Sequence, residues 1–297
     1  MSMGVLNNIA ATYAANNLSN TQASLQNVLT QLSSGSRINS GADDAAGLSL
    51  ANGLQANQTA LTQSASNVSL GVGLLQTADG ALSQVNNLLN RAVTLATEAG
   101  NGTLNGSQDA AANQEYQSIL AEINNIGAAT TYNGNAVFGA AGGVSIYTSD
   151  GTTAGTSTDT LTIAALSSAK VGDSGGTIAS GAGNTISYTV GTSVDLSATD
   201  LTSSANAQTA LTAIGKAINA VAGQRGYLGS QINTLNSMAS VETTQSENLA
   251  SASNSIMATD YTQATSELSK YQILTQTGIS ALAQANSTQQ AVTKLLQ

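Results

Sequence analysis

The feature that most constrains this chain is a pair of long heptad repeats, one in each half of its 297 residues. The first repeat runs from Leu61 to Ala96 and the second from Leu211 to Ile256, with spacings that alternate between three and four. Residues at this spacing share one side of an α-helix, and helices with such stripes pair as coiled coils. The chain contains no proline that would interrupt them. The repeats therefore predict two long helices that bury their stripes against each other.

The predicted seams contain a few polar residues among the apolar ones. The first seam comprises Leu61, Ala65, Val68, Val72, Leu75, Asp79, Leu82, Asn86, Leu89, Val93 and Ala96. The second comprises Leu211, Ile214, Ile218, Val221, Arg225, Leu228, Ile232, Leu235, Ala239, Glu242, Ser246, Leu249, Ser253 and Ile256. Polar seam residues fix the register of a coiled coil at a cost in stability.

Between the repeats the pattern changes twice. The glycine-rich stretch 100–106 predicts the end of a helix that starts near Asp43, and a shorter amphipathic helix around residues 116–126 follows. From residue 139 to about 203 the periodicity falls to two, which is typical of short strands in hairpins. Strands are predicted at 144–146, 161–163, 186–190 and 194–196.

Both ends of the chain are amphipathic but carry few large apolar residues. Ordering about 30 residues costs on the order of 30 to 60 kcal/mol in backbone entropy, whereas burying about eight apolar side chains returns roughly 12 to 24 kcal/mol. The ends are therefore expected to stay largely disordered until something large packs against them.

The segment LSSGSRINSGADDAAG, residues 32–47, joins the first amphipathic stretch to the long helix. Ser40 followed three residues later by Asp43 predicts a helix start there. Arg37, Asp43 and Asp44 concentrate charge in a chain of which only 8% of residues are charged. Two interpretations stay open: the aspartates favour the helix dipole while Arg37 is solvated, or the segment is a shaped joint that touches a neighbouring subunit.

Composition excludes several classes of function. The net charge is -9, and the seven Lys and Arg residues form no patch that would bind nucleic acid. Histidine and cysteine are absent, and the aspartates of the strand module are dispersed, so no catalytic site, metal site or cofactor is expected. No apolar run approaches a membrane span, and no signal-peptide pattern precedes Arg37, the first basic residue. Taken alone, these absences suggest a cytoplasmic protein.

Several long motifs resemble bacterial flagellin, in the order found in that family. LSSGSRINSGADDAAGLSLA, LLQTADGALSQVNNLLNRAVTLATEAGNGT and AEINNIGAATTYNG are similar to its N-terminal signature. TDYTQATSELSKYQILTQTGISALAQAN followed by AVTKLL is similar to its C-terminal signature. The resemblance covers roughly residues 1–138 and 205–297. The strand module falls where flagellins vary freely.

Periodicity and resemblance together give a mainly α fold: a long antiparallel helical coiled-coil bundle formed by the N- and C-terminal segments, with a small inserted β-hairpin module. The expected domains are a terminal coiled-coil domain, 1–42 and 258–297, that folds on assembly; a long-helix bundle, 43–138 and 205–257; and a small variable β module, 139–204. The resemblance implies a structural subunit that polymerises into the extracellular helical filament used for bacterial swimming.

The resemblance also implies how the subunit is delivered and what it meets. It implies export in unfolded form through the flagellar type III channel, without a cleaved signal peptide. The implied partners are other copies of the chain, the flagellar cap and hook-associated proteins, an export chaperone at the C-terminal segment, and a Toll-like innate receptor. Nucleic acid and membranes are not expected partners.

Two groups of residues follow as candidate sites. The candidates for subunit contacts are Val5, Ile9, Leu25, Leu29, Leu32, Arg37, Asp43, Asp44, Leu268, Tyr271, Leu282, Val292, Leu295 and Leu296. The candidates for the innate receptor are Arg91, Leu95 and Glu115, which match an Arg, a Leu four residues later and a Glu on the following helix in many flagellins. Val93 and Thr94 replace an Arg and a Glu of the fuller receptor motif.

Three other functions are alternatives to a filament subunit. A hook-filament junction protein of the same superfamily shares the terminal coiled coils. A cytoplasmic coiled-coil adaptor would explain the heptads but not the uncharged N-terminal end. An enzyme inserted in the variable module, such as a zinc protease, would need histidine, which this chain lacks.

Overall fold

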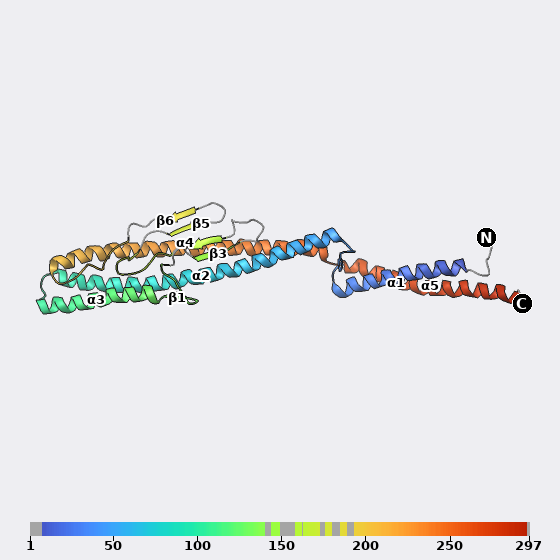
Figure 1. The fold of residues 1–297 in the computed structure, drawn as a ribbon, viewed down its shortest axis with the longest axis horizontal. Helices are drawn as coiled ribbons and strands as arrows, with labels where there is room; N and C mark the ends of the chain where they lie inside the picture. The colour runs from blue at the N-terminus through green and yellow to red at the C-terminus, as the bar shows by residue number, and fades with distance from the viewer. Residues whose placement is uncertain are drawn as a thin grey trace. The chain divides into compact units, whose positions relative to one another are not determined.

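The computed structural model describes residues 8–139, 144–148, 158–161, 163–172, 176–179, 185–188 and 193–295. Within these residues the chain forms five helices: α1 (Ile9–Ser34), α2 (Ala45–Gly100), α3 (Gly106–Ala129), α4 (Ser204–Met257) and α5 (Tyr261–Leu295) (Figure 1). The predicted mainly α fold is confirmed. Two compact units are present, one made of residues 1–56 and 249–297 and the other of residues 57–248. The three-domain division made from the sequence stays a prediction.

The second unit is built on α2 and α4, which run antiparallel. Thr62 Oγ1 lies 3.5 Å from Ser246 Oγ, and Arg225 Nε lies 2.7 Å from Asp79 Oδ1. The shorter α3 returns along α2 after the turn at residues 101–105, and Figure 1 shows the three helices side by side. An asparagine at position 105 caps α3 in a reciprocal capping box with Gln108. The two long helices and the helical hairpin are thus as predicted.

Part of each predicted seam is confirmed, and part is wrong by one residue. In α2 the predicted positions 61, 68, 75, 82, 89 and 96 are all buried, but the alternating set at 65, 72, 79, 86 and 93 is only half-buried. The buried set lies one residue earlier, at 64, 71, 78, 85, 92 and 99. In α4, positions 214, 221, 228, 235 and 242 are buried as predicted, whereas 210, 217, 224 and 231 replace the predicted 211, 218, 225 and 232 in the same way. The predicted positions 246, 249, 253 and 256 are only half-buried.

The physical reason for this shift is residue size. The buried set at the shifted positions consists mainly of small residues, such as Gly71, Ala78 and Ala217, which let closely packed helices approach. The larger apolar residues that follow them, such as Val72 and Ile218, flank the seam and pack against its edge. A pattern based on large apolar residues therefore identifies the residues at the edge of the seam and misses the small residues at its centre.

Two sheets accompany the helices. β1 (Thr131–Tyr132) and β2 (Asn135–Ala136) form a hairpin with Asn133 and Gly134 at its turn, both at positive φ, as expected for an Asn-Gly hairpin. A four-stranded antiparallel sheet has the order β3 (Val144–Tyr147), β4 (Thr158–Leu161), β5 (Gly176–Ala179), β6 (Thr185–Tyr188).

The strand predictions are partly correct. β3, β4 and β6 fall within or next to predicted strands, but β5 was not predicted, because its sequence, GTIA, has one large apolar residue and no alternation. The predicted strand at 194–196 is reduced to an isolated bridge between Val194 and Val171. Residues 189 and 190 lie outside the described residues.

The strand module packs closely against two glycines of the helices, which have no side chain to obstruct the contact. A Cβ at Gly71 of α2 would meet Ile146 Cδ1 at 2.0 Å, and a Cβ at Gly127 of α3 would meet the carbonyl oxygen of Leu166 at 2.0 Å. Ile146 and Leu166 are buried in the same apolar cluster as the helix seams. The module therefore shares the core of the bundle, in agreement with the expectation that it leans on the helices.

Among the residues that the structure describes, none of the helices is long and apolar enough to cross a membrane.

Candidate functional site

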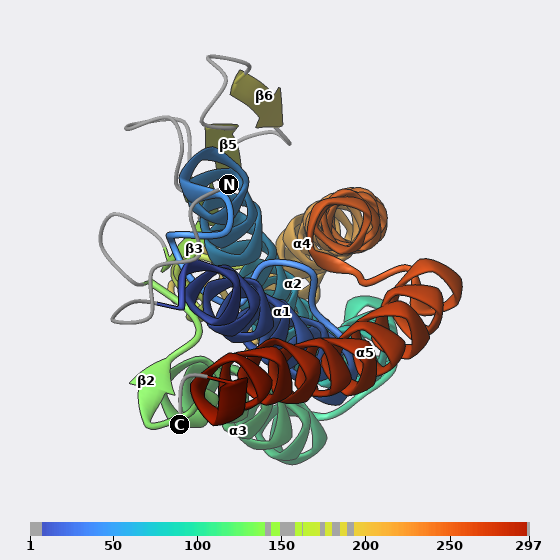
Figure 2. The ribbon, with the colours of Figure 1, turned by 90° about the vertical axis from the view of Figure 1, so that its right-hand side faces the viewer.

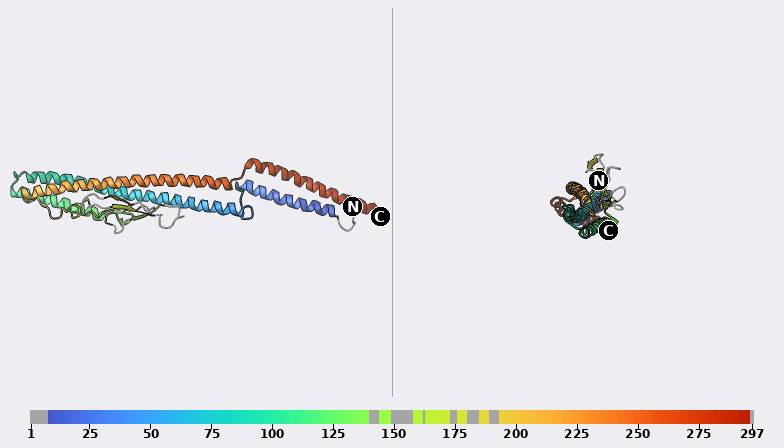
Figure 3. Two further views of the ribbon diagram at one scale, coloured as in Figure 1. Left: turned by 90° about the horizontal axis from the view of Figure 1, so that it is seen from above. Right: turned by 90° about the vertical axis from the view of Figure 1, so that its left-hand side faces the viewer.

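The first unit contains a helix pair with far less burial than the long helices. α1 and α5 lie side by side (Figures 2 and 3). They run antiparallel, since Asn8 Nδ2 donates to the Ala285 carbonyl at 2.9 Å near one end and Thr259 N donates to the Gly35 carbonyl at 3.1 Å near the other. Gly278 allows close packing, because a Cβ there would lie 3.2 Å from Leu18 Cδ1.

The outer faces of these two helices carry exposed large apolar side chains. Among the described side chains of α1 and α5, only Val28 and Ala264 are buried. The exposed set comprises Ile9 (64%), Tyr13 (68%) and Leu29 (47%) on α1 and Tyr261 (56%), Ile273 (66%), Leu274 (42%) and Ile279 (55%) on α5. We call these seven residues the terminal apolar surface. Large apolar groups left in water at this density mark an interaction surface.

The predicted contact residues divide between the inside and the outside of the helix pair. Ile9 and Leu29 belong to the terminal apolar surface. The half-buried residues of the predicted set are Leu25, Leu32, Leu268, Tyr271 and Leu282. Val292 and Leu295 belong to α5, whereas Val5 and Leu296 lie outside the described residues.

Sequence reasoning did not single out the other five members of the terminal apolar surface. Tyr13, Leu274 and Ile279 carry the helical periodicity, but periodicity does not say which side of a two-helix pair faces its partner. Ile273 does not belong to the helical series of apolar residues in the C-terminal segment, so the sequence did not mark it as a contact residue. Tyr261 stands at the start of α5, where its hydroxyl lies over Gly35, 2.9 Å from the place a Cβ would occupy.

The segments that connect these helices to α2 and α4 are tied together. α1 ends at Ser34 and is capped by Gly35, whose φ of 70° is the left-handed conformation that glycine adopts readily. Arg37 N then donates to the Met257 carbonyl at 2.7 Å, and Ser36 and Ala258 form an antiparallel bridge. We call this pairing of residues 35–38 with 256–259 the joint.

Arg37 is not simply solvated, as one of the two interpretations required. Its Nη2 donates to the Ile256 carbonyl at 3.0 Å, so the guanidinium caps the last turn of α4, where carbonyl groups lack helical partners. A cation at the negative end of a helix dipole is also favoured electrostatically. A contact of Arg37 with a neighbouring subunit stays a prediction.

The long helix begins at Ala45, two residues beyond the predicted start near Asp43, and the residue that caps it is Asp44 and not Ser40. Asp44 Oδ1 accepts from Gly47 N at 2.8 Å, and its carbonyl accepts from Leu48 N. Asp43 instead reaches back to the backbone N–H groups of residues 39 and 40, at 3.0 and 2.8 Å. These backbone hydrogen bonds lower the pKa of Asp43. The carboxylate of Asp43 thus holds the shape of the loop before α2.

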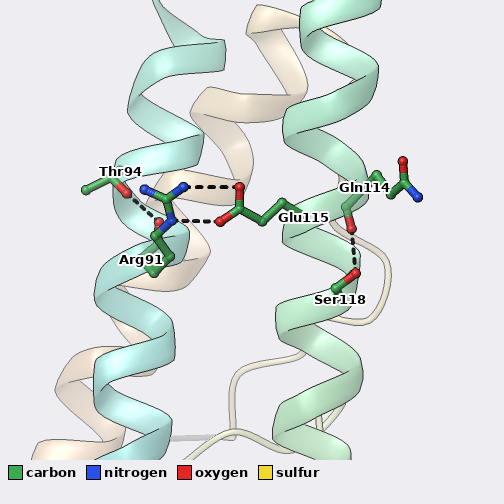
Figure 4. Close-up of polar contacts among 5 residues, drawn as sticks. All are labelled: Arg91, Thr94, Gln114, Glu115 and Ser118. Atoms are coloured by element: carbon green, nitrogen blue, oxygen red, sulfur yellow. Dashed lines mark hydrogen bonds and ion pairs between the residues drawn. The ribbon is translucent and has the colours of Figure 1, made fainter.

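The three candidate receptor residues lie in the second unit, where α2 and α3 run side by side (Figure 4). Arg91 and Glu115 form a two-pronged ion pair, with Nε–Oε1 at 2.7 Å and Nη2–Oε2 at 3.1 Å. The hydrogen bond from Arg91 lowers the pKa of Glu115. Both side chains are about half exposed, whereas Leu95 is only 3% exposed and belongs to the core. A protein that binds this face could therefore contact the ion pair but not Leu95.

Within the described part of the chain, no group of three or more acidic residues could hold a metal ion.

Comparison with known proteins identifies relatives at both ends of the chain. Residues 5–142 match the model of the bacterial flagellin N-terminal helical region, and residues 211–296 match that of the bacterial flagellin C-terminal helical region. Flagellin of Listeria monocytogenes is 36% identical over 271 residues, which cover 90% of each chain. Flagellin of Halalkalibacterium halodurans is 32% identical over 301 residues, which cover 99% of this chain and all of that one. The crystal structure of Bacillus cereus flagellin is 27% identical, covers 63% of this chain and 94% of that one, and superposes with a TM-score of 0.40.

Proposed function

This chain belongs to the bacterial flagellin family and is a subunit of the extracellular flagellar filament. From that premise we propose that the terminal apolar surface of α1 and α5 is the face through which each copy joins its neighbours in the filament. The observation that carries the proposal is the exposure of seven large apolar side chains on a helix pair that buries only two of its described residues.

Burying the exposed parts of these side chains against another copy would favour association. Moving a large apolar side chain out of water contributes roughly 1.5–3 kcal/mol. The charge distribution favours the same face: each copy has a net charge of -9, but α1 carries no charged residue at all. Like-charged copies can therefore approach each other along α1 with little repulsion.

The same features support delivery of the chain in an unfolded form. A helix pair with so little buried apolar area recovers only part of the entropy cost of ordering it, so it is weakly stable before assembly. We propose that the chain passes through the flagellar type III channel unfolded. An export chaperone that binds the apolar stripe of α5 would keep that stripe from associating early.

Contacts with other flagellar components follow from the same surface. At the two ends of a filament the terminal apolar surface would have no further copy of the chain to bury it. We propose that the cap and the hook-associated proteins cover it there. A catalytic role is not proposed, because the family is structural and the chain has neither histidine nor cysteine.

Recognition by a Toll-like receptor is proposed on the exposed ion pair of Arg91 and Glu115. A receptor that replaces this pair with its own charged groups would gain two charge-assisted hydrogen bonds. Receptor binding that is unchanged in Arg91→Ala would overturn this proposal.

Seeded polymerisation of the purified monomer, observed by negative-stain microscopy, tests the assembly surface. The full chain is compared with a chain lacking residues 1–40 and 258–297, and with the point variants Tyr13→Ser and Ile273→Ser. Asn16→Ser is the matched control, because Asn16 is exposed on α1 but contributes no large apolar side chain.

We expect filaments from the full chain and from Asn16→Ser, none from the trimmed chain, and a raised critical concentration for the two apolar variants. Filaments that form equally well from Tyr13→Ser, Ile273→Ser and the parent chain would show that the terminal apolar surface is not the joining face.

A further inference from the structure

Four asparagines in this chain are followed by glycine: Asn52, Asn101, Asn105 and Asn133. An Asn-Gly pair can react with itself without an enzyme. The backbone nitrogen of the glycine attacks the Cγ of the asparagine side chain, a five-membered succinimide closes, and ammonia leaves. Water then opens the ring at either carbonyl, which gives aspartate or isoaspartate and adds one negative charge. Glycine favours this reaction because it has no Cβ to obstruct the approach.

The helix protects Asn52. This residue lies inside α2, where the N–H of residue 53 takes part in the helical hydrogen-bond ladder. Helical backbone geometry also holds that nitrogen away from the Cγ of the preceding side chain. Ring closure at Asn52 requires local opening of a long helix.

A cap restrains Asn105. Its Oδ1 accepts from Ser107 N at 3.1 Å and Gln108 N at 3.0 Å, while the Gln108 side chain accepts from the Asn105 N–H at 3.0 Å. Ring closure would break this reciprocal cap and leave the first turn of α3 without partners for its N–H groups.

The hairpin restrains Asn133. Its φ of 51° and the φ of 79° at Gly134 are set by the tight turn between β1 and β2, where Tyr132 pairs with Asn135. A two-residue turn closed by a strand pair allows little backbone rotation. Asn133 is exposed, but it can react only when the hairpin opens.

Asn101 is held differently. It follows the last residue of α2 in the turn before α3, and its side-chain Nδ2 donates to Thr103 Oγ1 at 3.2 Å. This bond joins two exposed residues of the turn and closes no helix cap or strand pair, so Asn101 can approach the Gly102 nitrogen without opening a helix or a hairpin. The Thr103 hydroxyl sits next to the nitrogen that must leave as ammonia, where it can supply a proton. All three residues are exposed, so water has access for the hydrolysis step.

We propose that Asn101 is the position at which this protein deamidates spontaneously, and that the other three Asn-Gly pairs are protected by their structure. The product places a new carboxylate just beyond the C-terminal end of α2, one turn from Glu98, whose carbonyl accepts from the Asn101 N–H. A negative charge at that end of a helix is unfavourable. Deamidation therefore weakens the turn between α2 and α3 as the protein ages.

The test is an ageing experiment on the full-length monomer at mildly alkaline pH. Samples are digested at intervals, and mass spectrometry follows the mass increase of each asparagine peptide, while a protein isoaspartate methyltransferase labels the isoaspartate product. We expect Asn101 to convert at least about tenfold faster than Asn52 and Asn105, the rate ratio that corresponds to a modest barrier difference, and also faster than Asn133. Conversion of Asn133, Asn105 or Asn52 at a rate equal to or above that of Asn101 would overturn the proposal.

Two controls separate structure from local sequence. In concentrated urea all four pairs should react at similar rates, since the protecting elements are gone; a ranking that persists there would also overturn the proposal. Thr103→Val keeps the size of the side chain but removes the hydroxyl, and it should slow Asn101 several-fold without altering the other three. An unchanged rate at Asn101 in this variant would show that the Thr103 contact does not position the amide.

Discussion

The ion pair between Asp79 and Arg225 offers the sharpest test of how α2 and α4 hold their register. The sequence placed both residues at polar positions of the two heptad seams, and the structure joins them: Nε–Oδ1 is 2.7 Å and Nη2–Oδ2 is 3.1 Å. Each side chain is 36% exposed. The hydrogen bond to Asp79 raises the pKa of Arg225 further above its ordinary value.

The magnitude expected from this pair is modest. At an effective dielectric constant near 20, two charges about 4 Å apart attract by roughly 4 kcal/mol, but partial desolvation and the ordering of two side chains oppose most of that. Because more than a third of each side chain meets solvent, screening reduces it again, and we expect a coupling energy of about 1 kcal/mol, at the upper end for exposed pairs. Added salt should lower it.

A double-mutant cycle measures the coupling. Asp79→Ala, Arg225→Ala and the double variant are unfolded in urea and followed by far-UV circular dichroism, with the parent chain as reference. The matched cycle uses Arg91 and Glu115, which have the same two distances but are 56% and 46% exposed, so its coupling energy should be smaller. Equal coupling in the two cycles, or none at Asp79 and Arg225, would refute the reasoning from burial.

Three further predictions concern single side chains. Gly127→Ala should destabilise the second unit by about 1–3 kcal/mol through overpacking, whereas Gly80→Ala, where a Cβ would meet nothing within 4 Å, should stabilise it by up to about 1 kcal/mol; urea midpoints of both variants check this. Ser64→Ala removes the 2.7 Å hydrogen bond to the buried Glu242 and should cost about 1–3 kcal/mol in the same assay. The folded-state pKa of Asp43 is lowered, so its contribution to the loop before α2 is present above the ordinary carboxyl pKa and is lost as pH falls through the lower folded value. The protection factors of the loop amides, which compare their exchange with that of an unstructured peptide at the same pH, should therefore fall in acid, and Asp43→Asn should abolish that pH dependence.

The sequence predicts much of the helical part of the fold, because the heptad spacing identifies the helices and the extent of each repeat gives their approximate length. Leu75, Leu82 and Leu89 recur every seven residues and are all buried, as the repeat predicts. The other half of the seam is carried by small residues such as Gly71 and Ala78, whose burial depends on how near the partner helix comes. That distance is a tertiary property, and residue type alone does not reveal it.

The candidate site shows a similar division. The sequence shows that the chain ends are amphipathic. It does not show which of their apolar side chains pack against the partner helix and which stay exposed to solvent. Segment 32–47 stands out in the sequence because it concentrates turn residues and charge. The hydrogen bond from Arg37 to the Ile256 carbonyl, however, joins residues more than 200 positions apart. No local rule predicts a contact at that separation.

This separation governs the order in which the molecule can fold. Closing a flexible loop of about 220 residues costs roughly 5 kcal/mol beyond a constant term, and α1 finds its partner α5 only at the opposite end of the chain. Once α2 and α4 have paired, however, Thr62 and Ser246 are already neighbours, and the remaining loops on either side are short. Pairing α2 with α4 first would therefore lower the loop-closure cost of docking α1 on α5. A chain delivered from either end must wait until its last helix has arrived before its first helix can dock.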